Sequence, residues 1–235
     1  MLPYAYVKGD GFVVKVIRTG RRKTASVKVE EGKVCMAVPE SLSGSQIEAL
    51  LARKSRWIKE KLRLQQDAGP VKPKQYISGE RFTYLGRNYQ LHVAAGKPAA
   101  VKLRQGRLWV RVPGGRDNPG QVRDALTLWY RTHAEQKLQA KAEHYAGIIG
   151  VSPTAVCIKA FKSRWGSCDS RGLVQFNWKI IIAPIRIVDY LVVHELCHLQ
   201  QHNHSPLFWK CVEAVIPDYR ECRQWLKLNG RILQI

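Results

Sequence analysis

Residues 193–198, Val-His-Glu-Leu-Cys-His, contain the pattern His-Glu-x-x-His, and residues 199–204 continue as Leu-Gln-Gln-His-Asn-His. Residues three or four apart share one face of an α-helix, so a helix here would present the imidazoles of His194 and His198 side by side. Glu195 would then lie near enough to reach a water molecule held between them. The pattern therefore predicts a zinc ion with an open ligand position and Glu195 as a general base.

The sequence before this motif favours a buried helix that leads into it. Residues 185–193 are mostly apolar, and Pro184 occupies a place at which a helix can begin. The alternative is that the histidines are exposed polar residues or hydrogen-bonded core groups. A single histidine would fit that alternative, whereas a cluster of histidines favours metal binding.

Two histidines compete for the third ligand position. A continued helix would place His202 on the same face as the pair, but three ligands along one straight helix suit a tetrahedral site poorly. Asn203 tolerates a left-handed conformation and can end a helix. Ser205 and Pro206 then fit the N-cap and the first position of the next helix. The sequence favours His204 and leaves His202 as the alternative.

Two stretches in the first half of the chain repeat one pattern. Val27–Pro39 aligns without a gap with Val101–Pro113, at an offset of 101 − 27 = 74 residues. Each alternates with period two around a turn, which predicts a β-hairpin, and each precedes a helical pattern, at about residues 46–66 and 121–149. We infer two related hairpin-plus-helix units. Chance likeness between two amphipathic hairpins is the alternative.

Further elements flank these units. A strand is expected at residues 12–17, and an extra hairpin around residues 82–93 leads the second unit. The segment 67–74 predicts a linker. Closer to the motif, strands are expected at residues 156–160 and 173–178, separated by a segment rich in turn residues. An exposed strand edge beside a catalytic zinc can hold an extended peptide as an added strand.

Composition and cysteine usage indicate a reduced, globular protein. Hydrophobic residues make up 45% of 235 residues, no apolar run reaches membrane-spanning length, and the N-terminus shows no signal peptide, so we expect a cytoplasmic protein without a membrane partner. The six cysteines form no Cys-x-x-Cys pair and are expected to be reduced thiols. Cys197, within the motif, is expected to fill the core.

The chain is strongly basic, with 39 Lys and Arg against 18 Asp and Glu and a formal charge of +21. Such a charge attracts polyanions, nucleic acid first, whereas a solvated basic surface without a dedicated partner is the alternative. The positive residues that support nucleic-acid binding are Arg21, Arg22, Lys23, Arg53, Lys54, Arg56, Lys59 and Lys61.

The His-Glu-x-x-His motif and the stretches around it resemble the YgjP-like metallopeptidase domain family of the zincin clan, which is related to the SprT-like proteins. The likeness extends over most of the chain and is most specific in its final third. It is carried by Lys162–Cys168, Asn177–Trp178, Ala183–Pro184, Asp189–Tyr190, His194–His198, Asn203–Trp209 and Pro217–Tyr219. The resemblance implies a zincin core in which His194, His198 and His204 hold one Zn²⁺ and Glu195 is the base. It also implies that the long helix before residue 150 backs the catalytic sheet.

The expected reaction is hydrolysis of a peptide or protein substrate by a zinc-activated water, with Glu195 as the proton acceptor. The developing oxyanion needs a second electrophile. Arg164, Tyr190, Tyr219 and Arg223 have suitable chemistry, and Asn177 and Trp178 are further candidates for substrate contacts. For Arg164 the structural alternative is a loop salt bridge. For the two tyrosines it is simple packing.

Two rival functions follow from the same residues. A nucleic-acid-binding module could keep zinc for structure alone, although such a site does not need Glu195; a protease recruited to DNA or RNA would combine both roles. A zinc hydrolase of non-peptide amides is the third possibility. We predict an α+β fold with β-hairpin/helix units in residues 1–116, followed by a minimal zincin-like metallopeptidase domain in residues 117–235, which has a small sheet and an active-site helix.

Overall fold

A computed structural model describes residues 4–20, 24–30, 32–67, 73–115 and 118–235. The fold is mixed α+β, with small sheets and five α-helices among the described residues, which confirms the predicted class. The chain forms two compact units, Met1–Lys72 and Pro73–Ile235. Most of the predicted linker, residues 68–72, and the basic run 21–23 lie outside the described residues.

The first unit is a four-stranded sheet with one helix. Its sheet has the order β1-β2-β4-β3, in which β2 and β4 are parallel and the outer pairs are antiparallel. Alternate residues of β2 and β4 are buried and pack with apolar residues of α1, as period-two strands and an amphipathic helix should. The elements are β1 (Tyr4–Lys8), β2 (Val13–Arg18), β3 (Ser26–Glu30), β4 (Lys33–Val38) and α1 (Gly44–Asp67).

The second unit begins with the same arrangement. Its first sheet has the order β5-β6-β8-β7, again with a parallel central pair and antiparallel outer pairs. The elements are β5 (Arg81–Tyr84), β6 (Arg87–Ala95), β7 (Ala99–Arg104), β8 (Arg107–Val112) and α2 (Pro119–Ile149). The leading hairpin predicted as extra in this unit has a counterpart in the first, because β1 pairs with β2. This shared topology supports the inferred repeat.

The remainder of the second unit carries the motif. Its three-stranded sheet has the order β10-β11-β9, with β11 parallel to β9 and antiparallel to β10. The elements are β9 (Ala155–Lys159), β10 (Gly166–Cys168), β11 (Leu173–Asn177), the 3-10 helix η2 (Trp178–Ile182), α3 (Ile185–Cys197), α4 (Pro206–Val215), α5 (Tyr219–Asn229) and the 3-10 helix η3 (Gly230–Ile232). The strand β10 was not predicted, since its residues fall in the turn-rich segment.

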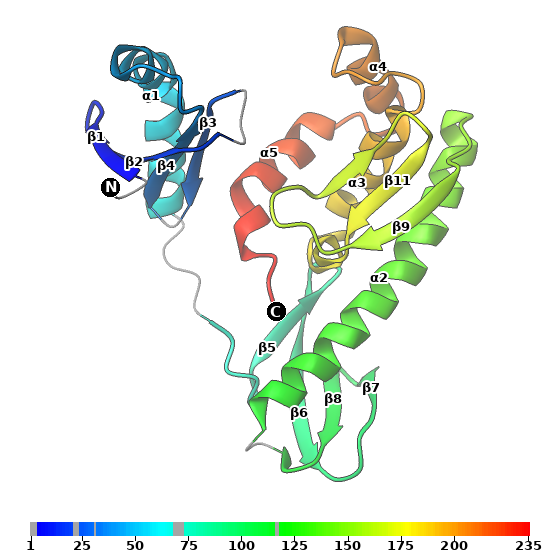
Figure 1. The fold of residues 1–235 in the computed structure, drawn as a ribbon. Coiled ribbons are helices and arrows are strands. Elements are labelled where there is room, and N and C mark those ends of the chain that lie inside the picture. Colours follow the sequence, from blue (N-terminus) through cyan, green and yellow to red (C-terminus); the bar gives the residue numbers. More distant parts are fainter. Residues whose placement is uncertain (1–3, 21–23, 31, 68–72, 116–117) are drawn as a thin grey trace. The chain divides into compact units, whose positions relative to one another are not determined.

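The helix α2 joins the two halves of this unit (Figure 1). One stripe of buried residues runs along its whole length, and it contacts β7 and β8 as well as η2, α3 and β9. Near its middle the Tyr130 hydroxyl donates to the Thr83 carbonyl at 2.8 Å, and further along Lys141 pairs with Asp189 of α3. The expectation that this helix backs the catalytic sheet agrees with these contacts.

The two compact units meet between residues 72 and 73, whereas the boundary between residues 116 and 117 stays a prediction. The β5–β6 turn docks on η2, where the Leu85 amide donates to the Ile181 carbonyl at 2.8 Å. Gly86 has a φ of +77°, and a Cβ there would lie 2.8 Å from the Pro184 Cα. One hydrophobic core consequently runs from β5 to the last helix.

None of the helices in the described part of the chain has the length and apolarity needed to cross a bilayer.

Candidate metal centre and active site

The helix α3 carries the first two histidines and is buried over most of its surface. It begins directly after Pro184, as the sequence indicates. It ends at Cys197, earlier than the terminator expected near Asn203, and in the turn that follows the amides of Gln200 and Gln201 both donate to the Cys197 carbonyl. His198 is the C-cap and keeps right-handed helical angles, φ −65° and ψ −17°, so that it still follows His194 by one turn.

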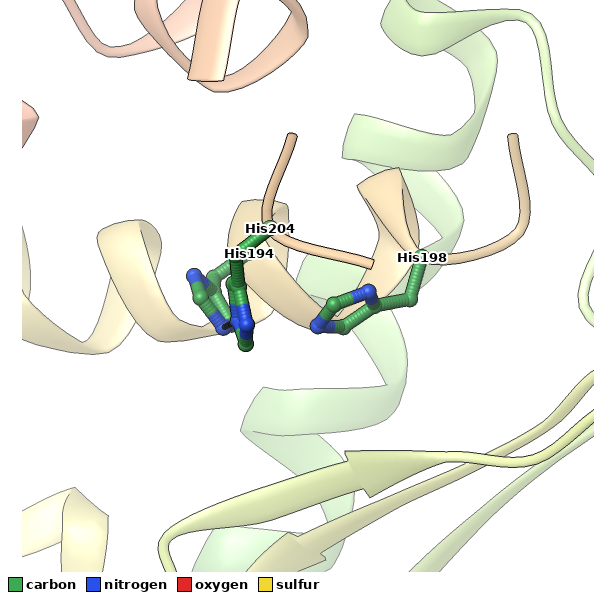
Figure 2. A group of neighbouring side chains, drawn as sticks. All are labelled: His194, His198 and His204. Carbon is green, nitrogen blue, oxygen red and sulfur yellow. Dashed lines mark hydrogen bonds between the residues drawn. The ribbon is translucent and has the colours of Figure 1, made fainter. Parts of the chain in front are cut away.

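Three imidazoles converge beside the last turn of this helix (Figure 2). One ring nitrogen from each of His194, His198 and His204 lies within 4.8 Å of the others. The Nε2 atoms of His194 and His204 are 3.1 Å apart. The other candidate ligand, His202, is exposed and does not belong to this group among the described residues.

Packing and capping return the chain to the pair after the turn. The Ser205 hydroxyl accepts a hydrogen bond from the Phe208 amide at 3.3 Å, and Pro206 takes the first position of α4, as predicted. Phe208 is fully buried and stacks on the His198 ring at 4.4 Å. Trp209 stacks on the His204 ring at 5.5 Å. The start of α4 thus fixes the place of the third imidazole.

The histidines are held in the neutral form, which is the form that binds metals. Burial first, and then the neighbouring imidazoles and the charge of Arg223, together lower the pKa of His194 to about 3. Burial also lowers the pKa values of His198 and His204. His198 Nδ1 lies 3.0 Å from the Gln201 carbonyl oxygen. With the proton on Nδ1, its Nε2 is left as a ligand.

This donor set fits a zinc ion. Two unprotonated ring nitrogens 3.1 Å apart repel each other unless a proton or a cation accompanies them. The buried Nδ1 of His194 has no hydrogen-bond partner among the described residues. Three neutral nitrogen donors are a set that catalytic zinc sites use, and they leave a fourth position open.

Glu195 lies buried beside this cluster, 5% exposed, against the strand β10. A Cβ on Gly166 would lie 2.6 Å from the Glu195 Oε1, so only glycine leaves room for the carboxylate. Burial raises the pKa of Glu195 to about 8, and the charge of Arg164 opposes this rise. Sequence reasoning did not single out Gly166, although a glycine within a strand is a known sign of close approach.

Two other predicted residues have contacts that build the site's frame. The Asn177 amide nitrogen donates to the carbonyls of Phe161 and Arg164, at 3.0 and 3.2 Å, and its oxygen accepts from the Lys179 amide at 3.2 Å. These bonds hold the loop before β10. Trp178 is buried, 6.3 Å from the Tyr130 ring. Arg164 lies over the Phe161 ring at 5.5 Å.

The aromatic and basic residues of α5 reach the other flank of the cluster. Tyr219 is buried and stacks on Trp209 at 5.0 Å, with the rings 14° apart. The Arg223 guanidinium carbon lies 4.7 Å from the Trp209 ring centroid. Tyr190, on α3, is 5.7 Å from the His194 ring, and burial raises its pKa to about 12. Trp209 was interpreted from sequence only as part of the motif, and its packing role depends on a contact between helices.

The cysteines are free thiols, as predicted. Cys197 is fully buried in the core, and its sulfur lies 2.8 Å from that of Cys211 on α4.

On α1, Lys59 pairs with Asp10 and Lys54 lies 5.9 Å from the Trp57 ring. Nucleic-acid binding by the basic residues remains a prediction.

Comparison with known proteins identifies the family. The family model for the YgjP-like metallopeptidase domain matches residues 23–229. One solved structure, the metallopeptidase zymogen of Pyrococcus abyssi abylysin, is 26% identical, with 39% of this chain and 95% of that chain covered and a TM-score of 0.36. No curated protein matches. Because the family model spans most of the 235 residues, the chain belongs to the YgjP-like metallopeptidase domain family.

Proposed function

We propose that this metallopeptidase domain uses one zinc ion, held by His194, His198 and His204, and that Glu195 is its general base. The observation that carries the proposal is the convergence of three imidazole nitrogens within 4.8 Å of one another. Glu195, which follows His194 in α3, carries a buried carboxylate. A structural zinc site would need neither a buried carboxylate nor an open ligand position.

The chemistry divides between the ion and the protein. When bound, zinc lowers the pKa of a water molecule to about 7 and polarises a carbonyl group. Glu195 accepts the proton of the attacking water and passes it to the leaving amine. Burial raises the pKa of Glu195, whereas the positive charge of Arg164 lowers it and so favours the carboxylate form that accepts the proton.

The edge strand β10 offers a place for the substrate. It is the terminal strand of its sheet and pairs with β11. Its first residue, Gly166, touches Glu195. An extended peptide or unfolded protein segment that adds to this edge would bring a backbone amide beside the base.

Three variants test the proposal by metal content and by cleavage of internally quenched peptides of mixed sequence. Glu195→Gln should retain one zinc and lose about 10²–10⁴-fold in turnover, the range for general bases. His204→Ala should lose zinc, whereas His202→Ala, the matched exposed control, should retain it. Equal zinc content in the two histidine variants, or full turnover by Glu195→Gln, would contradict the proposal.

A further inference from the structure

One arginine beside the histidine cluster has no acidic partner among the described residues. Arg223 is exposed on α5, which packs against α3 (Figure 1). Other arginines of this region are paired: Arg220 with Glu213 at 2.7 Å, and Arg186 with Glu221 at 3.0 Å. The Arg223 guanidinium therefore presents its N–H donors without a carboxylate to neutralise them.

Aromatic packing positions this guanidinium next to the metal ligands. Its carbon lies 4.7 Å from the Trp209 ring centroid, a distance typical of a cation–π contact. The Trp209 ring is in turn 5.5 Å from His204, at 21° to it, and 5.7 Å from His194. Arg223 is thus one ring away from two of the three imidazoles.

Arg164 and Arg223 lie in different segments of the chain and beside different groups of the site. Arg164 lies two residues before Gly166, the position that faces the Glu195 carboxylate, and its carbonyl accepts a hydrogen bond from Asn177. Arg223 instead lies over the Trp209 ring, which stacks on the His204 ring. Peptide hydrolysis needs a base that directs water to the carbonyl carbon and a separate donor for the carbonyl oxygen. Arg164 lies on the side of the base, which leaves Arg223 for the oxygen.

We propose that Arg223 is a catalytic residue that donates hydrogen bonds to the oxygen of the scissile carbonyl as this oxygen gains negative charge. The inference rests on the proposed function. As the water oxygen bonds to the carbonyl carbon, its proton moves to Glu195 and the π electron pair moves to the carbonyl oxygen, which Arg223 stabilises. When the C–N bond breaks, the electron pair returns and the leaving nitrogen takes the proton from Glu195.

Steady-state kinetics on the zinc-loaded full chain test this role, with internally quenched peptides as substrates. Arg223→Ala should lower kcat by about 10²-fold with little change in KM, the usual cost of removing one oxyanion donor. Arg223→Lys should fall between this variant and the parent. Guanidinium chloride at low concentration should restore part of the kcat of Arg223→Ala. Arg220→Ala, which removes a paired arginine from the same helix, is the matched control and should keep the parent's kcat.

A binding measurement gives a second readout. A phosphinic peptide, built on the best-cleaved sequence, carries an anionic tetrahedral centre in place of the scissile amide. Calorimetry should show that Arg223→Ala binds it about 10²-fold more weakly than the parent, with zinc content unchanged. If Arg223→Ala kept the kcat of the parent and its affinity for the phosphinic peptide, the role proposed for Arg223 would be wrong. The proposed function would not be affected by that result. A zinc-loaded parent that neither cleaves peptides nor binds the phosphinic peptide would overturn the proposed function, and this inference with it.

Discussion

The Glu195 carboxylate occupies space that any side chain at position 166 would need. The strand β10 contributes the α-carbon of Gly166, and α3 contributes the carboxylate. The strand therefore limits sterically where the carboxylate of Glu195 can lie. This close approach also explains part of the burial that raises the Glu195 pKa. The geometry of the base thus depends on a residue that carries no chemistry of its own.

We expect Gly166→Ala to lower turnover while zinc stays bound. The new Cβ would lie 2.6 Å from the Glu195 Oε1 and would displace the carboxylate, whereas the three histidines would stay in place. A loss of at least about tenfold in kcat is expected, since small misplacements of a catalytic group are costly. Gly147→Ala is the control, because it is exposed in α2 and meets no atom within 4 Å. Unchanged kcat in Gly166→Ala would show that the base has room to move.

Sequence reasoning was most informative for residues whose relation is set by helical spacing. The pairing of His194 with His198 follows from the period of one helix, and the structure brings a ring nitrogen of each within 4.8 Å of the other. Gly166 beside Glu195, and Arg223 over Trp209, are contacts between segments far apart in the chain. No local pattern encodes such contacts, which is why the sequence left several candidates open for the oxyanion.

At the scale of elements, the turn between α3 and α4 decides the third ligand. The periodicity of the chain predicted the long helices and most strands, because their apolar residues repeat with a clear period. The strand β10 was missed since it has only three residues, Gly-Ser-Cys, and exists through pairing with β11. The early end of α3 was missed for a similar reason, since a closed turn and not a terminator residue follows it.

The N-cap of α4 should therefore affect zinc binding and not only stability. Ser205→Ala removes the acceptor for the Phe208 amide and should cost about 1 kcal/mol of the free energy of unfolding. Because His204 directly precedes the cap, zinc affinity should fall by up to about fivefold, the same free energy expressed as binding. Asn118→Ala removes the corresponding cap of α2 and should lower stability without this loss. Competition with a zinc chelator and thermal unfolding measure the two effects.

At the scale of the whole chain, packing and not repetition sets the division into units. The repeat suggested that both hairpin-plus-helix units belong together, ahead of a catalytic domain. The helix α2 is long enough to cover the sheet of β5–β8 and then to continue along η2, α3 and β9. The second unit of the repeat is therefore built into the same compact unit as the histidine cluster.

Two truncations distinguish these divisions. Residues 73–235 keep the whole core and should unfold cooperatively and bind one zinc. Residues 117–235 lack β5–β8 and would expose Val122, Leu126, Trp129 and Tyr130 of α2, which are buried in the full chain. Each such side chain contributes roughly 1.5–3 kcal/mol when buried, so their exposure together approaches the whole stability of a domain. This shorter piece should aggregate or fail to show a cooperative transition by circular dichroism. If it folded and bound zinc as tightly as residues 73–235, the β5–β8 sheet would be an accessory to the metallopeptidase core, and the boundary at 116 and 117 would be the physical one.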